Sequence, residues 1–445
     1  MKRCCPAGWR GPSLTRTAAR CALLLSAVLT ASACGGGPVV EPPRDGRCDD
    51  ADPWHWAGLA SDALHTRTFR TRAMYDLDEA ERAVPFAPGP CEACEAVVSY
   101  PAPTRHPGGP VGLGRLRDRS YVYDNALYAL LRTAEGRQSS ARAVLDTLVA
   151  LQRPDGAWGF SFAIAEDGFY NVGYVRTGTV AWVLYAMARY EARFGGGRYV
   201  ASMRRAGAFL LARADPQHGL LRGGFGRWSQ DGARFLPMDA PTWASTEHNL
   251  DAAFAGRAAS AVDPDGLYPD GVELAGRVAA RLYLADAGHY ARGLQPNGPD
   301  RVVALDSVGT WSALLDLARG DLERALRGLE AVDRLLGGRD GPWRIWRPGD
   351  EHAADTWFVE GSVARAIALG RADRRGAALD DLRQLGRWAC AGGVPLTYAS
   401  RWARDFPVTP AVAPTVWFVF AARELVGGHG PELWNESLRA DGRNR

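Results

Sequence analysis

The chain has 445 residues, a formal net charge of +3 and 10% aromatic residues, including 15 tryptophans. So small a net charge does not indicate a nucleic acid or another polyanion as a partner. The length is large for one domain, but a closed ring of helices can reach it. Tryptophan is as common in hydrophobic cores as on the surfaces that stack against sugars, so its high count alone assigns no function.

The first 33 residues are predicted to be a secretory signal peptide. Basic residues precede the short apolar run CALLLSAVLTASAC, which is too short to span a membrane. The run ends at Cys34, and a glycine run follows, as at a bacterial lipoprotein cleavage site; ordinary cleavage after Ala33 is the alternative. We therefore expect export and lipidation of Cys34, with anchoring to the bacterial cell envelope at the outer membrane or cell surface.

Residues 34–52 are rich in glycine, proline and charged residues and are predicted to be a flexible tether. Export implies an oxidising compartment, where the remaining cysteines can form up to two disulfides of open pairing. These cysteines are Cys48, Cys91, Cys94 and Cys390. The C-x-x-C motif at Cys91 and Cys94 has no second copy and no βαβ setting, so we expect a disulfide in a loop rather than zinc or thioredoxin chemistry.

Residues 53–430 are predicted to form one domain of helical hairpins. Each hairpin joins an apolar helix, rich in small and aromatic residues and opened by polar groups, to an amphipathic helix with one charged face. The polar openings lie near residues 122, 176, 245, 307, 357 and 415. An array with this spacing indicates stacked helical hairpins.

The apolar helices suit an inner ring of six, and the amphipathic helices suit an outer ring of six. A helix over Trp54–Arg70 is expected to complete the outer ring, a short strand is expected at 96–102, and residues 431–445 are predicted to be a C-terminal tail. If the inner helices are parallel, their N-termini meet at one end of the ring. The polar openings would then surround one cavity.

Five segments carry a resemblance to a known family: YDNALYALL, VRTGTVAWV, STEHNLDAAFA, DTWFVEGSVARAIAL and APTVWFVFAARE. Together they resemble six-hairpin glycosidase-like proteins, over roughly residues 121–425. The resemblance implies an all-α (α/α)6 toroid and a carbohydrate substrate. It does not fix the activity, because the same fold also hosts polysaccharide lyases and sugar epimerases. We therefore choose the catalytic candidates from chemistry.

Glycoside hydrolysis needs two carboxyl groups that face each other across the sugar. Glu247 is expected to be the general acid, because the neighbouring Trp243 and Phe254 can raise its pKa, although a carboxylate there could also just complement the helix dipole. Asp124 in YVYDNA is expected to be the second carboxyl unless it is a helix cap. Glu360 is the alternative second carboxyl.

Polar and aromatic residues near these carboxyls are the candidates for binding substrate. Arg176 could orient a hydroxyl or a uronate carboxylate. Asp251 shares a helix face with Glu247, and Asp306 is either a helix cap or a site residue. The expected substrate-binding residues are Tyr123, Arg176, Trp243, His248, Asn249, Asp251, Trp311 and Trp357.

Two other motifs are interpreted as turns. The segment QRPDGAWGFSF resembles a terpene-cyclase repeat, but it occurs once and no Asp-rich diphosphate motif accompanies it. The segment DPDGLYPDG does not match an EF-hand loop. The sequence contains no P-loop, nucleophile elbow or H-E-x-x-H motif. We therefore expect neither a cofactor nor a metal.

The sequence predicts a carbohydrate-active enzyme, foremost a glycoside hydrolase with Glu247 as acid and Asp124 or Glu360 as base. One alternative is a glycan-binding or scaffold lipoprotein without catalytic activity. The other is a polysaccharide lyase or sugar epimerase, which would use His248 or a tyrosine as base and Arg176 to hold a uronate.

Overall fold

The structure is a computed structural model. It describes residues 52–71, 91–101, 116–165, 173–228, 235–236, 239–340, 343–352, 356–387, 389, 393–394, 397–399 and 409–439. The predicted signal peptide, Cys34, the tether, Cys48 and Cys390 lie outside the described residues. Within the described residues, no helix is both long and apolar enough to cross a membrane.

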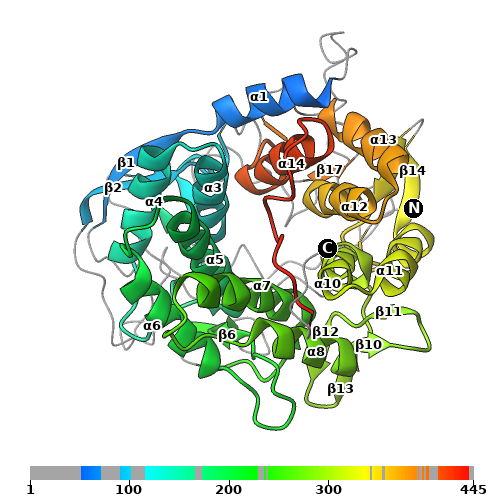
Figure 1. The fold of residues 1–445 in the computed structure, drawn as a ribbon, viewed down its shortest axis with the longest axis horizontal. Coiled ribbons are helices and arrows are strands. Elements are labelled where there is room, and N and C mark those ends of the chain that lie inside the picture. The colour runs from blue at the N-terminus through cyan, green and yellow to red at the C-terminus, as the bar shows by residue number, and fades with distance from the viewer. Residues whose placement is uncertain are drawn as a thin grey trace, which may run out of the picture.

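In this part of the chain, helical hairpins close into a ring of two layers (Figure 1). The inner helices are α3 Val122–Ala134, α5 Thr177–Phe194, α7 Thr246–Val262, α10 Trp311–Arg319, α12 Val359–Arg371 and α14 Val412–Leu425. The outer helices are α4 Gln138–Ala150, α6 Val200–Leu211, α8 Gly271–Arg281, α11 Leu322–Leu335, α13 Arg375–Gly386 and α1 Pro53–Ala63. Because α1 packs on α14 and α14 packs on α3, the ring is closed. The predicted (α/α)6 toroid is confirmed.

Burial differs between the two layers as their sequences predict. In the inner helix α5, every residue from Thr177 to Ala188 is buried, because the helix packs between α3 and α7 and is covered by α6. In the outer helix α11, the buried residues Ala325, Leu329 and Val332 form one stripe at helical spacing. The short helix α9 Leu305–Gly309 precedes α10 and packs on α11.

The first hairpin is completed differently from the prediction. The helix expected over Trp54–Arg70 ends at Ala63, and β1 Thr66–Thr71 follows it. β1 pairs antiparallel with β2 Cys91–Val97, so the strand expected at 96–102 lies earlier in the chain. Threonines at positions 66, 68 and 71 favour a strand over a helix because they are β-branched. Cys94 in β2 is buried and forms a disulfide bond.

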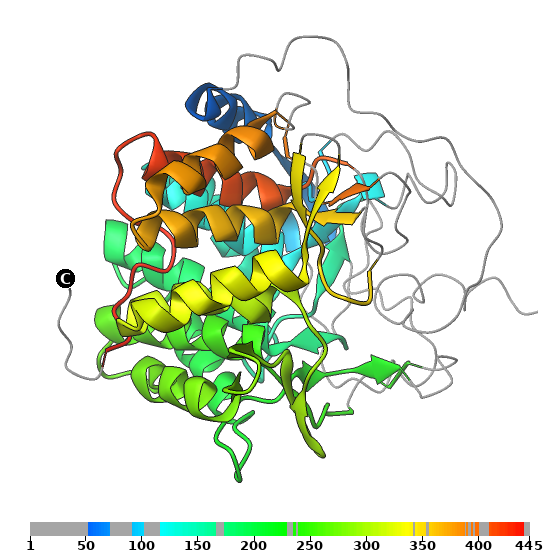
Figure 2. The ribbon, with the colours of Figure 1, turned by 90° about the vertical axis from the view of Figure 1, so that its right-hand side faces the viewer.

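Short strands lead into most of the inner helices. β3 Arg119–Tyr121, β5 Val175–Arg176, β9 Ala244–Ser245 and β16 Thr356–Phe358 directly precede α3, α5, α7 and α12. Their partners are β4 Ser161–Ala163, β6 Gly224–Phe225, β12 Gly293–Gln295 and β17 Thr397–Ala399. Figure 2 shows many of the strands at one end of the ring, where they fix the entry of these four inner helices.

The remaining strands form small hairpins between helices. β13 Gly298–Asp300 extends the sheet of β9 and β12. The other pairs are β7 Arg227–Trp228 with β8 Phe235–Leu236, β10 Tyr283–Leu284 with β11 His289–Tyr290, and β14 Gly337–Asp340 with β15 Trp343–Trp346.

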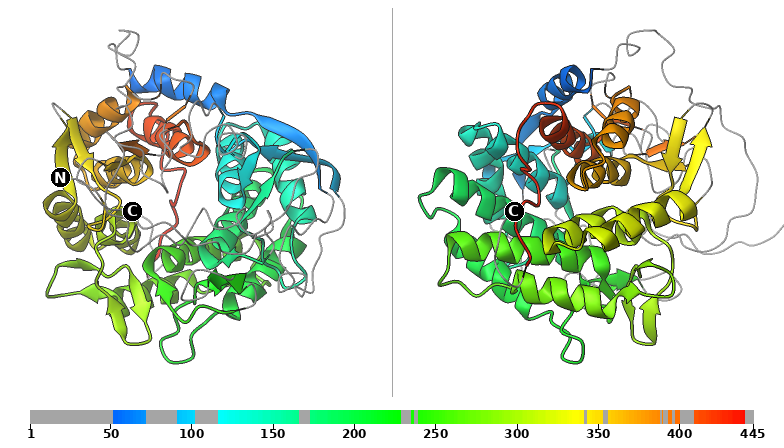
Figure 3. Two further views of the ribbon diagram at one scale, coloured as in Figure 1. Left: turned by 180° about the vertical axis from the view of Figure 1, so that it is seen from behind. Right: turned by 45° about the vertical axis from the view of Figure 1, so that its right-hand side comes forward.

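After α14 the chain runs across the ring (Figures 1 and 3). Leu433, Trp434 and Leu438 are buried, each 2% exposed, and belong to the main hydrophobic core. The predicted C-terminal tail is therefore anchored in the toroid by these three residues.

Candidate functional site

The N-terminal ends of the inner helices bring four carboxyl groups together. Glu247 and Asp251 come from α7, Asp306 from α9 and Glu360 from α12. The carboxyl of Glu247 hydrogen-bonds to that of Asp306, and the charges of Asp306 and Glu360 act on it. Asp251 is influenced by all three others. We call these four residues the carboxyl cluster. Groups separated by more than 100 residues converge because the inner helices begin at the same end of the ring.

Glu247 holds a proton in this cluster. Helix α7 begins directly before it because the Ser245 hydroxyl accepts a hydrogen bond from the His248 N–H. Burial raises the pKa of Glu247 well above its usual range, and the charges of Asp306 and Glu360 raise it further. A carboxyl whose pKa is raised in this way, and which remains partly exposed, is suited to donate a proton.

Asp306 is the partner that accepts the hydrogen bond from Glu247. Burial raises the pKa of Asp306, but hydrogen bonds from the Ser307 hydroxyl and N–H, and from Glu247, stabilise its charged form. The Ser307 hydroxyl lies 2.7 Å from the Asp306 carboxylate. Two carboxyls this close cannot both be ionised without a large repulsion. We therefore place the shared proton on Glu247 and the charge on Asp306.

Glu360 is held by two aromatic residues. The Tyr123 hydroxyl donates to Glu360 Oε1 at 2.5 Å, and the Trp417 indole N–H donates to the Tyr123 oxygen at 3.1 Å. Burial raises the pKa of Glu360 to about 8, and the charges of Asp124 and Asp306 raise it too, whereas the hydrogen bonds from Tyr123 and Trp417 oppose the rise. Tyr123, predicted to bind substrate, thus positions a catalytic candidate.

Asp124 lies close to Glu360 of the cluster, and its charge raises the pKa of that carboxyl. It is 6% exposed, hydrogen-bonds to Ser99, and has a pKa raised to about 7 by burial. Its charge acts on Tyr100, Tyr121 and Glu360. Because it follows Tyr123, it is rotated by about 100° around α3 from the side chain that contacts Glu360.

Asp251 lies one turn deeper in α7 than Glu247. It is 3% exposed, the Trp182 indole hydrogen-bonds to it, and its pKa is raised well above the usual range by burial and by Glu247 and Asp306. Its Oδ1 atom has no hydrogen-bond partner among the described residues. Such buried unsatisfied atoms are uncommon in folded proteins and often mark a place where a ligand or water binds.

His248, Arg176 and Trp243 form a second group next to Glu247. The Arg176 guanidinium lies 3.8 Å from the Tyr174 ring and 5.6 Å from the Trp243 ring, and it donates to three backbone carbonyls. The rings of Trp243 and His248 are 5.7 Å apart. Burial and the charge of Arg176 lower the pKa of His248 to about 3, so its ring is neutral. Its Nδ1 has no partner in the described part of the chain.

Gly178 allows α5 and α7 to approach each other at this point. A Cβ atom on Gly178 would lie 2.5 Å from His248 Cδ2 and 2.7 Å from Asp251 Oδ2. Any side chain here would displace two site residues. The glycine in the VRTGTVAWV segment therefore sets the position of His248 and Asp251.

Asn249, predicted to bind substrate, instead holds the chain that precedes its helix. Its Oδ1 accepts from the Leu221 N–H at 2.7 Å, and its Nδ2 donates to the carbonyls of Leu221 at 3.0 Å and Ser245 at 2.7 Å. Asn125, also the fourth residue of an inner helix, bonds the N–H of Val97 in the same way. Asn249 thus has a structural role, because its oxygen and both amide hydrogens are already used.

Replacing Asn249 by Ala should lower the free energy of unfolding by roughly 2–3 kcal/mol, because the N–H and carbonyl of Leu221 lose their buried partner. Chemical denaturation measures this loss, with Gln217→Ala, an exposed residue, as the control. An Asn249→Ala variant of unchanged stability that no longer binds sugar would restore the substrate-binding role.

Trp311 and Trp357, two of the three predicted tryptophans, are placed differently from each other. Trp311 in α10 packs edge-on to Trp417, with ring centres 5.7 Å apart, and its Nε1 has no partner within the described residues. Trp357 in β16 is 2% exposed and packs with Ile345 and Trp343 in a small separate cluster, so it belongs to a core. Trp182, which hydrogen-bonds to Asp251, was not among the predicted site residues.

Among the described residues, no group of three His, Cys, Asp or Glu side chains is arranged to hold a metal ion.

Buried carboxyls of raised pKa should make the protein less stable as the pH rises. Asp124 and Glu360 have folded-state pKa values of about 7 and 8, above the unfolded values near 4. The folded state therefore binds more protons than the unfolded state between pH 4 and 8, and this stability is lost as the pH rises through that window. We expect Tm to fall by roughly 5 °C from pH 5 to 8.5 in a calorimeter, and by less in Asp124→Asn and Glu360→Gln. A Tm that rises over this range would contradict the assignment.

No protein-family model matches the chain, and no curated protein matches it. Solved structures do match. One of a glycosidase variant has 16% identity and a TM-score of 0.55, and covers 84% of this chain and 96% of its own. One of a glycosidase variant in complex with glucose has 15% identity, a TM-score of 0.54 and the same coverage.

A cellobiose 2-epimerase from Bacillus thermoamylovorans matches with 7% identity and a TM-score of 0.52, over 69% of this chain and 88% of its own. Identities this low bear on the fold and not on the reaction. This chain has the (α/α)6 fold of six-hairpin glycosidase-like proteins.

Proposed function

We propose that this protein is a glycoside hydrolase whose carboxyl cluster cleaves the glycosidic bond. The observation that carries the proposal is the pairing of Glu247 with Asp306, which keeps Glu247 protonated, beside a second carboxyl, Glu360, from another inner helix. An acid and a base of this kind are the two groups that glycoside hydrolysis requires.

In the proposed reaction, Glu247 gives its proton to the glycosidic oxygen as the bond from that oxygen to the anomeric carbon breaks. A water molecule forms the new bond to the anomeric carbon, and ionised Glu360 takes a proton from this water. Asp306 keeps the proton on Glu247 before the reaction. Tyr123 orients the Glu360 carboxylate by its hydrogen bond.

The sugar hydroxyls would be bound by polar atoms that lack partners. The atoms Asp251 Oδ1 and His248 Nδ1 are buried and have no hydrogen-bond partner among the described residues. His248 directly follows Glu247 in the sequence, and Asp251 lies one helical turn after Glu247 in α7. Trp243 is partly exposed and offers a ring face for stacking on a sugar. One of the similar glycosidase structures is a complex with glucose, which supports a hexose as the sugar bound here.

A lyase or epimerase mechanism is less well supported. Such a reaction needs a base that removes a proton from carbon, and His248, with a pKa lowered to about 3, binds protons too weakly. Arg176 donates to three backbone carbonyls, all through Nη1, so these bonds do not exclude a uronate at the rest of the guanidinium. The lowered pKa of His248 is the observation that favours the hydrolase.

A glycoside screen tests the proposal. The purified protein is incubated with p-nitrophenyl α- and β-glycosides of glucose, galactose, mannose and N-acetylglucosamine, and Glu247→Gln serves as the background. Release of p-nitrophenol by the wild type, above that of the variant, supports the hydrolase. Binding of these sugars by both proteins, with turnover by neither, would instead support a glycan-binding lipoprotein.

We also propose that the protein is exported and anchored through a lipid on Cys34. The disulfide at Cys94 supports this location, because such bonds persist in oxidising compartments. Metabolic labelling with a radioactive fatty acid should mark the wild type and not Cys34→Ala. If the Cys34→Ala variant is labelled, or the wild type is not, the proposal of a lipid on Cys34 is contradicted.

A further inference from the structure

The chain after α14 ties together the far ends of the inner helices. In this crossing segment, defined as residues 430–439, the carbonyls of Leu433 and Trp434 accept from Arg371 in the last turn of α12, at 2.6 and 2.8 Å. Arg189 of α5 donates to Asn435 at 2.7 Å and Glu436 at 2.9 Å. The Leu438 N–H donates to the Ala318 carbonyl of α10 at 3.0 Å, and Arg423 of α14 pairs with Glu432.

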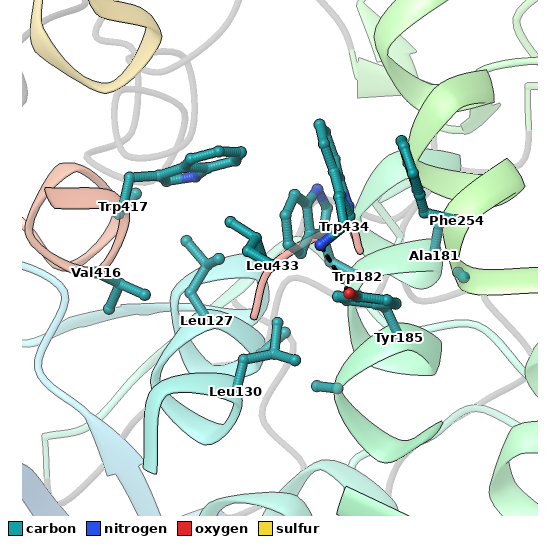
Figure 4. Close-up of a cluster of buried hydrophobic side chains, with 14 of the residues drawn as sticks. Leu127, Leu130, Ala181, Trp182, Tyr185, Phe254, Val416, Trp417, Leu433 and Trp434 are labelled. Atoms are coloured by element: carbon teal, nitrogen blue, oxygen red, sulfur yellow. Dashed lines mark hydrogen bonds between the residues drawn. The ribbon is translucent and has the colours of Figure 1, made fainter. Parts of the chain in front are cut away.

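Trp434 is the deepest residue of the crossing segment. Figure 4 shows its ring between those of Trp182 and Phe254, with ring centres 5.1 and 4.8 Å away. The backbone N–H of Trp434 donates to the Tyr185 hydroxyl at 2.8 Å. Its φ of 49° lies in the left-handed region, which is unfavourable for a bulky residue and persists only where contacts hold it. Here the backbone conformation is stabilised by the Trp182 and Phe254 rings on the two faces of the indole and by the hydrogen bond to Tyr185.

The rings around Trp434 also support the carboxyl cluster. Trp182, stacked on Trp434, hydrogen-bonds to Asp251. Trp417, whose ring centre is 5.5 Å from that of Trp434, donates to Tyr123, which donates to Glu360. The crossing segment therefore lies directly beneath the site.

The two ends of the ring differ in exposure. At the helix N-termini, Tyr123, Glu247 and Asp306 remain partly exposed. One turn or more deeper, Trp182, Tyr185, Phe254, Trp417 and Trp434 are between 0% and 4% exposed. The unpartnered Asp251 Oδ1 lies about one helical turn, or roughly 5 Å, below Glu247 and just above this apolar layer. In the described residues, the layer closes the site from below.

We propose that the crossing segment makes the site blind-ended, so that it takes a small glycoside or the end of a sugar chain and not the interior of a polysaccharide. The inference rests on the proposed hydrolase function. A sugar that reaches Asp251 from Glu247 meets the aromatic layer and has no exit for a further residue. Only a sugar with one free end can occupy this depth.

The test combines product analysis with tail variants. Maltohexaose and cellohexaose with a fluorophore at the reducing end are digested by the wild type, Trp434→Ala, Trp434→Phe and the exposed-surface control Leu267→Ala, and the p-nitrophenyl panel is run in parallel. The wild type should shorten a hexasaccharide by one sugar at a time from an end, or should hydrolyse only the aryl glycosides. Trp434→Ala should lose roughly tenfold to a hundredfold in kcat. Trp434→Phe, which keeps a stacked ring, should recover most of this loss.

The outcomes separate this inference from the proposed function. Hydrolysis of neither the hexasaccharides nor the aryl glycosides by the wild type would overturn the hydrolase itself and this inference with it. Hydrolysis in which labelled fragments shortened by several sugars at once appear first would overturn the blind-ended site alone. A folded Trp434→Ala variant with wild-type kcat, KM and products would also overturn it, because the aromatic layer would then not limit the site.

Discussion

Hydrolysis of p-nitrophenyl glycosides should fall by about a thousandfold in kcat when Glu247 is replaced by Gln. A glutamine cannot release a proton to the leaving oxygen, whereas it keeps the shape of the side chain. Its amide N–H can still donate to Asp306, so the pair remains hydrogen-bonded and the fold is retained. KM should change little, because the lost interaction operates in the transition state.

The leaving group separates a general acid from a binding residue. A 2,4-dinitrophenol leaving group departs without protonation, so Glu247→Gln should hydrolyse a 2,4-dinitrophenyl glycoside nearly as fast as the wild type. The matched control is Glu323→Gln, whose side chain is 82% exposed, and which should match the wild type on both substrates. An equal loss on both substrates would show that Glu247 binds or positions the sugar and does not protonate it.

The ring of helical hairpins could be predicted from sequence because the same alternation of helix types repeats along the chain. Each inner helix packs on three sides and each outer helix on one, so apolar and amphipathic helices alternate along the chain. The convergence of Glu247 and Glu360 then follows from parallel inner helices. The strand at Thr66–Thr71 was missed, because a segment that occurs once has no repeat to correct its assignment.

The register of the inner helices contains a signal that the sequence analysis did not use. Tyr123, Glu247, Asp306 and Glu360 are each the second residue of their helix. Trp182, Asp251 and Trp417 are each the sixth residue, one turn further on the same face. Aligning the helix starts would have added Asp306 and Trp182 to the site and set aside Asn249, the fourth residue. Asp124, the third residue, stays a predicted base.

Trp434 could not be predicted in this way. It contacts Trp182 and Phe254, about 250 and 180 residues earlier, from a segment without periodicity. Its position depends on two hydrogen bonds of its backbone: the carbonyl accepts from Arg371, and the N–H donates to the Tyr185 hydroxyl. Almost any residue type could make these two bonds. Sequence patterns carry no information about such contacts.

The pH profile of the wild type should rise through pH 8, and this rise should depend on Glu360. A general base acts only when it has lost its proton, and burial together with nearby charges raises the pKa of Glu360 to about 8. We therefore expect kcat/KM to increase as the pH passes this value, and to fall again when Glu247, whose pKa is raised well above its usual range, loses its proton. Glu360→Gln should lower kcat/KM by about a thousandfold and abolish the rise.

Two neighbours of Glu360 should shift this rise in opposite directions. Asp124→Asn removes a negative charge that raises the pKa of Glu360, so the rise should move to lower pH. Tyr123→Phe removes a hydrogen bond that stabilises the ionised carboxylate, so the rise should move to higher pH. A structural disturbance alone would lower the rate without moving the two profiles apart. If Asp124→Asn instead abolishes hydrolysis while Glu360→Gln remains active, Asp124 is the base, because only the residue that takes the proton cannot be replaced by an amide.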